Sequence, residues 1–231
     1  MLKRPEICRL KRLAISMLAL SGAQLAIAAR APAIEPETVP AAIDHADAID
    51  SPQRVIEIFH AGLLEIMKQA EELGFQGRTD ELAPLMQQTF DLEFMASKTV
   101  GRHWRKLSDE DKQRWASIFA RFTTANYAGR FKGYTGEKFI TVGVEDASHG
   151  SRVVLTKIIV PNEKDVRLNY RMVERDGIWK VIDVFLNGTV SELALRRSEY
   201  SSALKRNGFD QLIASVETKI EDLETKGQVE G

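Results

Sequence analysis

Cysteine is almost absent from this chain, because Cys8 is the only one in 231 residues. A framework of disulfides is therefore excluded, and so is a zinc site built from thiolates. The four histidines are His45, His60, His103 and His149, and no two of them have the spacing of metal ligands. We therefore expect neither a metal site nor another cofactor.

An excess of charge of one sign is also lacking. The chain has 32 Lys and Arg residues against 33 Asp and Glu residues, for a formal net charge of -1. This balance gives no support for nucleic acid as a partner. The sequence patterns of P-loops, dinucleotide-binding folds and nucleophile-elbow hydrolases are absent too. We find no catalytic motif and expect a protein that is not an enzyme.

Residues 1–28 have the pattern of an export signal. Five basic residues flank or precede an apolar stretch from Leu13 to Ala28, which ends in an A-x-A cleavage pattern, Ala26-Ile27-Ala28. The apolar stretch is shorter than the ~20 residues of a membrane span, although an uncut membrane anchor is the alternative. Cleavage near Ala28 would remove Cys8 and leave the mature chain with a net charge of about -5.

The rest of the chain divides by composition into a linker, a folded domain and a tail. Residues 29–50 are rich in alanine, proline and acidic residues, which predicts a linker before a domain over residues 51–224 and a polar tail over residues 225–231. Within the domain, helical periodicity and capping residues predict helices over residues 52–73, from Thr79, over 92–100, over 108–131, over 191–206 and from Phe209.

From Lys138 the hydrophobic period changes from helical to alternating. Four strands are predicted, Lys138–Val144, Arg152–Val160, Val166–Glu174 and Ile178–Leu186. Their connections are short and polar, which favours antiparallel neighbours, and Asp176-Gly177 is a strong hairpin signal. We therefore predict an α+β fold in which helices pack on one side of a curled four-stranded antiparallel sheet.

The hairpin over residues 165–188 is interpreted as the back wall of an apolar cup. Ten residues are predicted to line it as a lipid-binding surface: Trp104, Phe119, Phe122, Tyr127, Leu155, Leu168, Tyr170, Met172, Val181 and Phe185. Each of them is also compatible with a place in a solid core. The small residues Ala125 and Gly129 on the long helix indicate either close helix packing or space for a ligand.

Asp183 is the only acid inside the fourth predicted strand. Such a carboxylate acts either as a general base or as half of an ion pair with Arg171 or Arg197, and pairing is favoured because an unpaired buried charge is costly. A basic run on the long helix is either the solvated face of that helix or a surface for anionic headgroups: Arg121, Arg130 and Lys132.

The order of several short segments resembles that of one known family. These segments are Val100-Gly101-Arg102-His103-Trp104, Phe90-Asp91-Leu92, Trp179-Lys180-Val181-Ile182-Asp183-Val184 and Arg197-Ser198-Glu199-Tyr200. Together they resemble the MlaC family, also known as the toluene-tolerance auxiliary family, over roughly residues 51–220. The segment from Phe185 to Arg206 is more similar to the hopanoid-associated HpnM branch than to the phospholipid branch.

This resemblance implies an NTF2-like fold with a small helical subdomain and a soluble, monomeric, periplasmic lipid carrier. The implied cargo is a hopanoid or a phospholipid, and the implied partners are an inner-membrane transporter complex and an outer-membrane acceptor. Two other functions remain open at this stage. One is an NTF2-like enzyme that acts on a small apolar substrate with Asp183 as base, and the other is an adaptor with a filled interior and no cargo.

Overall fold

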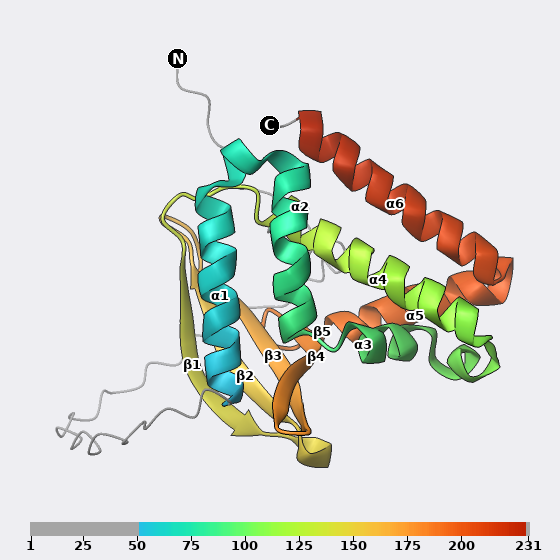
Figure 1. Ribbon diagram of the computed structural model, residues 1–231. Helices are drawn as coiled ribbons and strands as arrows, with labels where there is room; N and C mark the ends of the chain where they lie inside the picture. The colour runs from blue at the N-terminus through green and yellow to red at the C-terminus, as the bar shows by residue number, and fades with distance from the viewer. Residues whose placement is uncertain (1–50, 230–231) are drawn as a thin grey trace, which may run out of the picture. The chain divides into compact units, whose positions relative to one another are not determined.

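Six α-helices and one antiparallel sheet make up the computed structural model, which describes residues 51–229 (Figure 1). The predicted export signal and linker lie outside the described residues. The helices are α1 (Pro52–Lys68), α2 (Ala70–Thr89), α3 (Leu92–Val100), α4 (Asp109–Arg130), α5 (Glu192–Asn207) and α6 (Phe209–Val229), with short 3-10 helices η2 (Gly101–Lys106) and η3 (Ser148–Gly150).

The sheet has five strands in the order of the sequence, and all neighbours are antiparallel. The strands are β1 (Lys138–Asp146), β2 (Arg152–Ile159), β3 (Val166–Arg175), β4 (Ile178–Leu186) and β5 (Val190–Ser191). The four predicted strands are confirmed, and β5 is a two-residue addition at the edge. Asp176 and Gly177 both have positive φ, 53° and 78°, as the predicted hairpin turn requires.

Two irregularities in the pairing bend the sheet. The register shifts between Thr141 and Gly143 in β1, and again between Arg171 and Met172 where β3 meets β4. An extra residue on one strand of a pair increases the local twist and bends that strand. The helices lie on one side of the resulting sheet, with α1 in front of it (Figure 1). This arrangement confirms the predicted α+β class.

The first predicted helix is two helices in the structure. Ser51 caps α1 through its hydroxyl, which accepts a hydrogen bond from the Arg54 N–H at 3.1 Å, as predicted. The chain then breaks at Gln69 and bends again at Gly74, whose φ of 60° is not helical. The expected helix start at Thr79 is wrong, because α2 is continuous there and the Thr79 hydroxyl donates to the Phe75 carbonyl within it.

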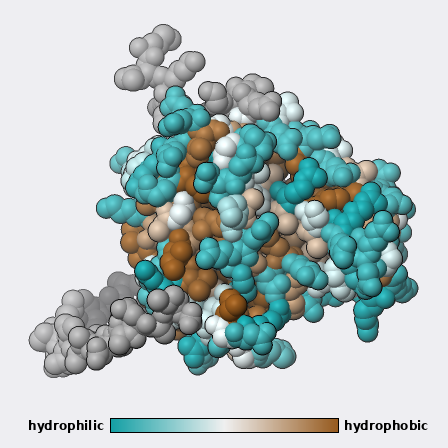
Figure 2. Space-filling view, viewed as in Figure 1, coloured by the Kyte–Doolittle hydropathy of each residue, from teal (hydrophilic) through white to brown (hydrophobic). Residues whose placement is uncertain are grey.

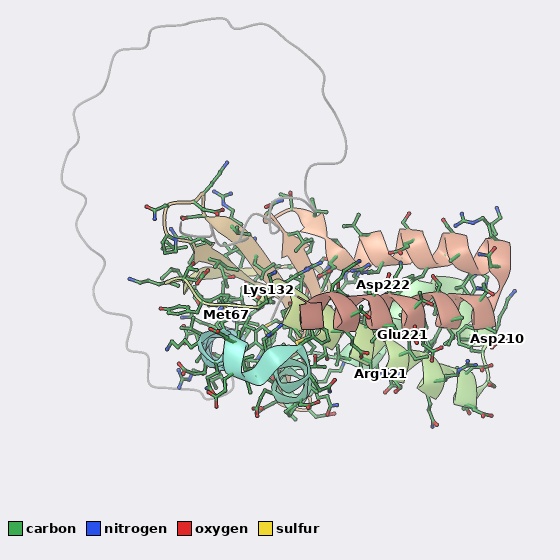
Figure 3. The ribbon with its side chains drawn as sticks, turned by 90° about the horizontal axis from the view of Figure 1, so that it is seen from above. Met67, Arg121, Lys132, Asp210, Glu221 and Asp222 are labelled. Atoms are coloured by element: carbon green, nitrogen blue, oxygen red, sulfur yellow. The ribbon has the colours of Figure 1, made fainter. Side chains whose placement is uncertain are left out.

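The helices α3 to α6 form a second layer beside the sheet. Seen from above, α5 and α6 have similar directions (Figure 3), but they diverge from the turn that joins them (Figure 1), and α6 packs on α4. The core of this layer contains Trp115, whose indole N–H donates to the Ala96 carbonyl at 3.0 Å and to the Thr99 hydroxyl at 3.3 Å. Tyr200 packs edge-on against the same ring, with 5.2 Å between centroids. This layer corresponds to the predicted helical subdomain. The helix α6 continues to Val229, into the segment predicted as a polar tail.

Over the described residues, no helix combines the length and the hydrophobicity that a membrane crossing requires. Apolar side chains nevertheless reach the surface in separate patches on the face shown in Figure 2. The most exposed large apolar residues are Val142 at 62% and Ile178 at 58%. These two residues lie in different strands, β1 and β4, which makes them useful as a matched pair for mutagenesis.

Candidate lipid-binding site

The face of the sheet that looks toward α1 carries four of the predicted lining residues. Tyr170 marks this face, because its hydroxyl is 3.0 Å from His60 Nε2 on α1. Leu168 and Met172 lie two residues to either side of Tyr170 in β3, so alternation puts them on the same face, and Val181 of β4 is the pairing partner of Met172. All four are between 0% and 6% exposed. This part of the predicted cup is therefore packed with side chains.

An aromatic cluster occupies the space between this face and the helices. It consists of Phe59 and His60 from α1, Phe90 from the α2–α3 junction, Tyr127 from α4, and Tyr170. The ring centroids of neighbouring members lie 5.2 to 6.5 Å apart, mostly in edge-to-face contacts. Such pairs contribute about 0.5–1.5 kcal/mol each beyond the burial of their area. The cluster joins α1, α4 and the sheet into one apolar layer.

His60 is the polar member of this cluster, and the sequence analysis did not single it out. Its ring stacks on Phe139 of β1 with 4.4 Å between centroids, and only 4% of its surface is exposed. Burial lowers the pKa of His60 from 6.5 to about 3, so the ring is neutral at physiological pH. A signal was present in the sequence, because His60 lies four residues after Ile56 on the buried stripe of α1.

The other six predicted lining residues do not form one surface. Tyr127 belongs to the aromatic cluster, whereas Leu155 and Phe185 alternate with the inward residues Val154 and Val184 and therefore lie on the opposite face of the sheet. The remaining three are in the helical layer. Phe119 packs near Trp115, Phe122 lies under the Arg196 guanidinium at 4.8 Å, and Trp104 lies in η2.

A cleft of about 390 Å³ opens beside the aromatic cluster, and we call it the α2–α3 cleft. Its lining combines apolar and charged side chains: Gln87, Phe90, Asp91, Leu92, Glu93, Arg175, Ile178 and Lys180. Phe90 is the residue shared by the cleft and the cluster, and only 3% of its surface is exposed. Phe90 is therefore the residue at which the cleft and the apolar layer adjoin. The volume is within the range of ~300–1,000 Å³ that is usual for small-molecule sites.

A few polar contacts hold the two sides of this cleft together. Arg175 of the β3–β4 hairpin forms an ion pair with Asp91, which also caps α3 by accepting from the Phe94 N–H at 3.0 Å. The Lys180 ammonium donates to the carbonyls of Gln87 and Gln88 at the end of α2. The Arg175 side chain is 50% exposed, and exposed ion pairs of this kind typically contribute only ~0.2–1 kcal/mol.

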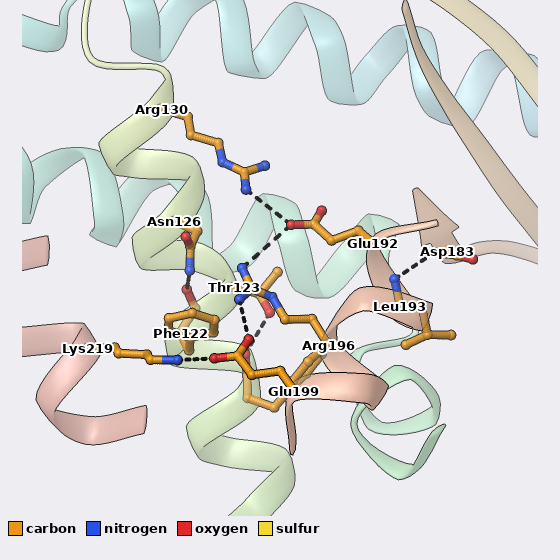
Figure 4. Close-up of polar contacts among 11 residues, drawn as sticks. Phe122, Thr123, Asn126, Arg130, Asp183, Glu192, Leu193, Arg196, Glu199 and Lys219 are labelled. Atoms are coloured by element: carbon orange, nitrogen blue, oxygen red, sulfur yellow. Dashed lines mark hydrogen bonds and ion pairs between the residues drawn. The ribbon is translucent and has the colours of Figure 1, made fainter. Parts of the chain in front are cut away.

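Asp183 differs from its expected role. Its carboxylate accepts hydrogen bonds from the Val184 N–H at 2.8 Å, the Leu193 N–H at 3.1 Å and the Ser191 hydroxyl at 2.6 Å, so it fixes the start of α5 (Figure 4). The expected partner Arg171 instead donates to Ser148 and Ser151. Burial raises the pKa of Asp183, and the three hydrogen bonds oppose that increase.

The charged residues around α5 are engaged with one another. Glu192 lies 3.2 Å from Arg130 at the end of α4 and 3.8 Å from Arg196 (Figure 4). Arg196 also pairs with Glu199, and Lys219 of α6 contacts the same Glu199 carboxylate. This network ties α4, α5 and α6 together. One member of the predicted basic run is therefore a structural residue, and it is not available to a headgroup.

The described part of the chain contains no group of three His, Cys, Asp or Glu side chains that could hold a metal ion. The fold and the site define an α+β protein with an apolar layer between a bent sheet and its helices, and with a cleft that shares Phe90 with this layer. Comparison with known families then identifies it: residues 59–218 match the family described as MlaC protein, and the chain belongs to that family.

One similar solved structure is that of the phospholipid-binding protein from Ralstonia solanacearum, in complex with a phospholipid. It shares 20% sequence identity with this chain and superposes with a TM-score of 0.64, over 74% of this chain and 98% of that one. At this identity the likeness shows a common fold. A search of curated proteins finds no match.

Proposed function

We propose that this protein is a soluble carrier that binds a phospholipid, or a related apolar lipid such as a hopanoid, and moves it between membranes. Membership of the MlaC family and the phospholipid in the similar Ralstonia structure support this proposal. The observation that carries it within this chain is the position of Phe90, which belongs both to the apolar layer and to the lining of the α2–α3 cleft.

The energetics of lipid transfer explain what such a layer supplies. Each buried methylene stabilises a lipid by about 0.8 kcal/mol, so an acyl chain of ~16 carbons is held in a bilayer by roughly 12 kcal/mol. Water offers no comparable environment, and spontaneous transfer is correspondingly slow. An apolar protein interior provides a similar stabilisation, which brings the equilibrium between membrane and carrier near balance. No catalytic group is needed, and direction comes from partners that distinguish the loaded form from the empty form.

Lipid entry requires the sheet and the helices to separate, because the inner face is filled by its own side chains. We place the entrance at the α2–α3 cleft. Its contacts across the opening are the exposed Arg175–Asp91 ion pair, the Lys180 bonds to α2, and the 2.9 Å bond from the Asp91 N–H to the Val181 carbonyl. Displacement of Phe90 from the aromatic cluster would then expose the apolar layer to the entering chain.

The proposed compartment is the periplasm, reached through the export signal with cleavage near Ala28. The proposed exchange partners are an inner-membrane transporter complex and an outer-membrane acceptor, and the carrier acts as a monomer. Asp183 does not support the alternative of an enzyme, because its three hydrogen bonds occupy both carboxylate oxygens at the start of α5. We assign it a structural role.

The first test is extraction of lipid from residues 29–231 purified under native conditions, followed by mass spectrometry. We expect a bound phospholipid or hopanoid in a fixed ratio to protein, and the extract identifies which of the two it is. Protein that is lipid-free in repeated preparations, and that takes up no lipid from vesicles, would refute the carrier function.

The entrance is tested with a matched pair of variants. Ile178→Asp places a charge in the lining of the α2–α3 cleft, and Val142→Asp places one at a similarly exposed position on β1, away from the cleft. Both positions are largely exposed, so we expect little change in melting temperature from either. Lipid uptake should fall for Ile178→Asp alone, and equal uptake by the two variants would move the entrance elsewhere.

A further inference from the structure

A second cleft, of about 340 Å³, lies at the opposite end of α3 from the α2–α3 cleft. We call it the basic cleft, and its lining is Ser97, Lys98, Gly101, Arg102, Trp104, Arg105 and Arg197. Four of these seven residues are cationic and none is acidic. The whole chain carries a net charge of only -1, so this concentration of positive charge is a local feature.

The local backbone brings these cations together. Gly101, at the junction of α3 and η2, has a φ of 56°, a conformation that favours glycine. A Cβ at this position would lie 3.3 Å from two guanidinium nitrogens of Arg197, so the absence of a side chain lets α5 bring Arg197 against the α3–η2 turn. The consecutive segments α3 and η2 thus share one cleft with α5, which lies far away in the sequence.

The arginines of the basic cleft have no carboxylate partner within residues 51–229, whereas several arginines elsewhere in the fold are paired. Arg175, Arg130 and Arg196 each form an ion pair, but Arg102 and Arg105 form none with any described residue. The acidic residues that follow Arg102 and Arg105 in sequence begin α4, and there Asp109 is bonded to Lys112. Glu199, two residues after Arg197, is paired with Arg196 and Lys219. The negative end of the α3 dipole stabilises cations near the last turn of this helix, which can explain the positions of Lys98 and Arg102 but not of the other residues. It leaves Arg105, Arg197 and the half-buried Trp104 unexplained.

We propose that the basic cleft binds the phosphate group of anionic phospholipid headgroups and so docks the carrier directly on a membrane surface. Guanidinium groups suit this role because their fixed fork of donors matches phosphate oxygens. Tryptophan suits it because its amphipathic ring favours the headgroup region of a bilayer. This inference extends the proposed function by adding the bilayer surface itself as a partner.

The position of the basic cleft relative to the proposed entrance supports this assignment. The two clefts lie at the two ends of α3, whose nine residues span about 14 Å. Between them, Phe94 of α3 is covered by the cations Arg175, at 4.9 Å, and Lys98, at 4.7 Å. A carrier held by the basic cleft would therefore present the α2–α3 cleft and the exposed Ile178 close to the same lipid surface.

The test is sedimentation of residues 29–231 with vesicles of phosphatidylglycerol in phosphatidylcholine and with vesicles of phosphatidylcholine alone. Each Lys or Arg near an anionic surface strengthens binding about fivefold. We therefore expect Arg102→Gln combined with Arg105→Gln to weaken binding to the anionic vesicles by about 25-fold. The matched control neutralises two exposed cations elsewhere, with Lys164→Gln in the β2–β3 turn and Lys226→Gln on α6, and should bind like the unaltered protein.

Equal losses in the two double variants would overturn the proposal, because binding would then follow total charge and not the basic cleft. In a second arm of the experiment, inorganic phosphate is added at constant ionic strength, and we expect it to compete with the anionic vesicles for the protein. A failure to compete would refute a site for the phosphate group. If the protein carries lipid but binds no anionic vesicle, docking on lipid is refuted while the carrier function stands, and an acidic protein surface becomes the partner of the cleft. Vesicle binding by a protein that neither co-purifies with lipid nor takes up lipid from vesicles would refute the carrier function alone.

Discussion

Acid should destabilise this protein through one side chain, His60. The ring lies between α1 and the sheet, stacked on Phe139 and bonded to Tyr170. Burial is the cause of its lowered pKa, and no neighbouring charge stabilises a protonated ring. The unfolded chain takes up a proton near pH 6.5, whereas the folded chain does so only at about pH 3. The stability that the neutral ring contributes is therefore complete above pH 6.5 and is lost as the pH falls toward 3.

The magnitude follows from the two pKa values. Between them, each unit of pH changes the free energy of unfolding by about 1.4 kcal/mol. At about pH 5 the loss relative to neutral pH is therefore roughly 2 kcal/mol, and at pH 3 it approaches about 5 kcal/mol. Domains are typically stable by ~5–15 kcal/mol, so His60 alone accounts for a substantial part of the sensitivity to acid.

The assay is urea unfolding of the unaltered protein and of His60→Gln at about pH 7.5 and about pH 5. Glutamine keeps a hydrogen-bonding group toward Tyr170 but does not titrate. All other groups titrate alike in both proteins, so the difference between the two pH dependences isolates His60. We expect the unaltered protein to lose about 2 kcal/mol more than the variant between these conditions. Parallel losses in both proteins would show that His60 is not held neutral by burial.

Two further predictions concern contacts between secondary-structure elements. Phe90 and Val181 are bridge partners, with a backbone spacing of ~4.8 Å, so Phe90→Cys combined with Val181→Cys should form a disulfide that closes the proposed entrance. Because residues 29–231 contain no cysteine, lipid uptake should fall on oxidation and return on reduction, and unchanged uptake by the oxidised form would exclude this entrance. In α6, Gly227→Ala should lower the melting temperature, because the new Cβ would lie 2.6 Å from Phe75 Cγ. In a helix without such a contact, the same change is normally stabilising by ~1 kcal/mol. A higher melting temperature would show that α6 is not packed on Phe75 at that point.

The order and type of the elements were predictable because their signals are local. Alternation over eight to ten residues identified the four long strands, and Asp176-Gly177 identified the hairpin, since both patterns act through neighbouring residues of the chain. The helix boundary at Ser108 was predictable for the same reason, because its hydroxyl accepts from the Asp111 N–H three residues later. The break at Gln69 was missed because the apolar stripe of α1 runs on through it toward Leu73.

The candidate site was predictable only in part, because it depends on which face of each element is covered. Leu168 and Leu155 are both apolar residues of alternating strands, yet they lie on opposite faces of the sheet. Which of the two side chains faces α1 depends on how each strand is oriented relative to α1, and the register of strand pairing sets that orientation. Asp183 gives a second example, because its partners Ser191 and Leu193 are eight and ten residues away in sequence, within and just after an unpredicted strand.

The sequence by itself determined most of the helices, the four long strands with their antiparallel order, the α+β class and, through the order of its short segments, the family. These properties arise from interactions within a strand, a helix turn or a hairpin, which a linear pattern records. Only the tertiary structure decided that His60 is buried against Tyr170, that Phe90 belongs to both a cleft and the apolar layer, and that Arg197 joins Arg102 and Arg105 around one basic cleft. Each of these contacts joins residues that are distant in the chain, and packing between layers sets them.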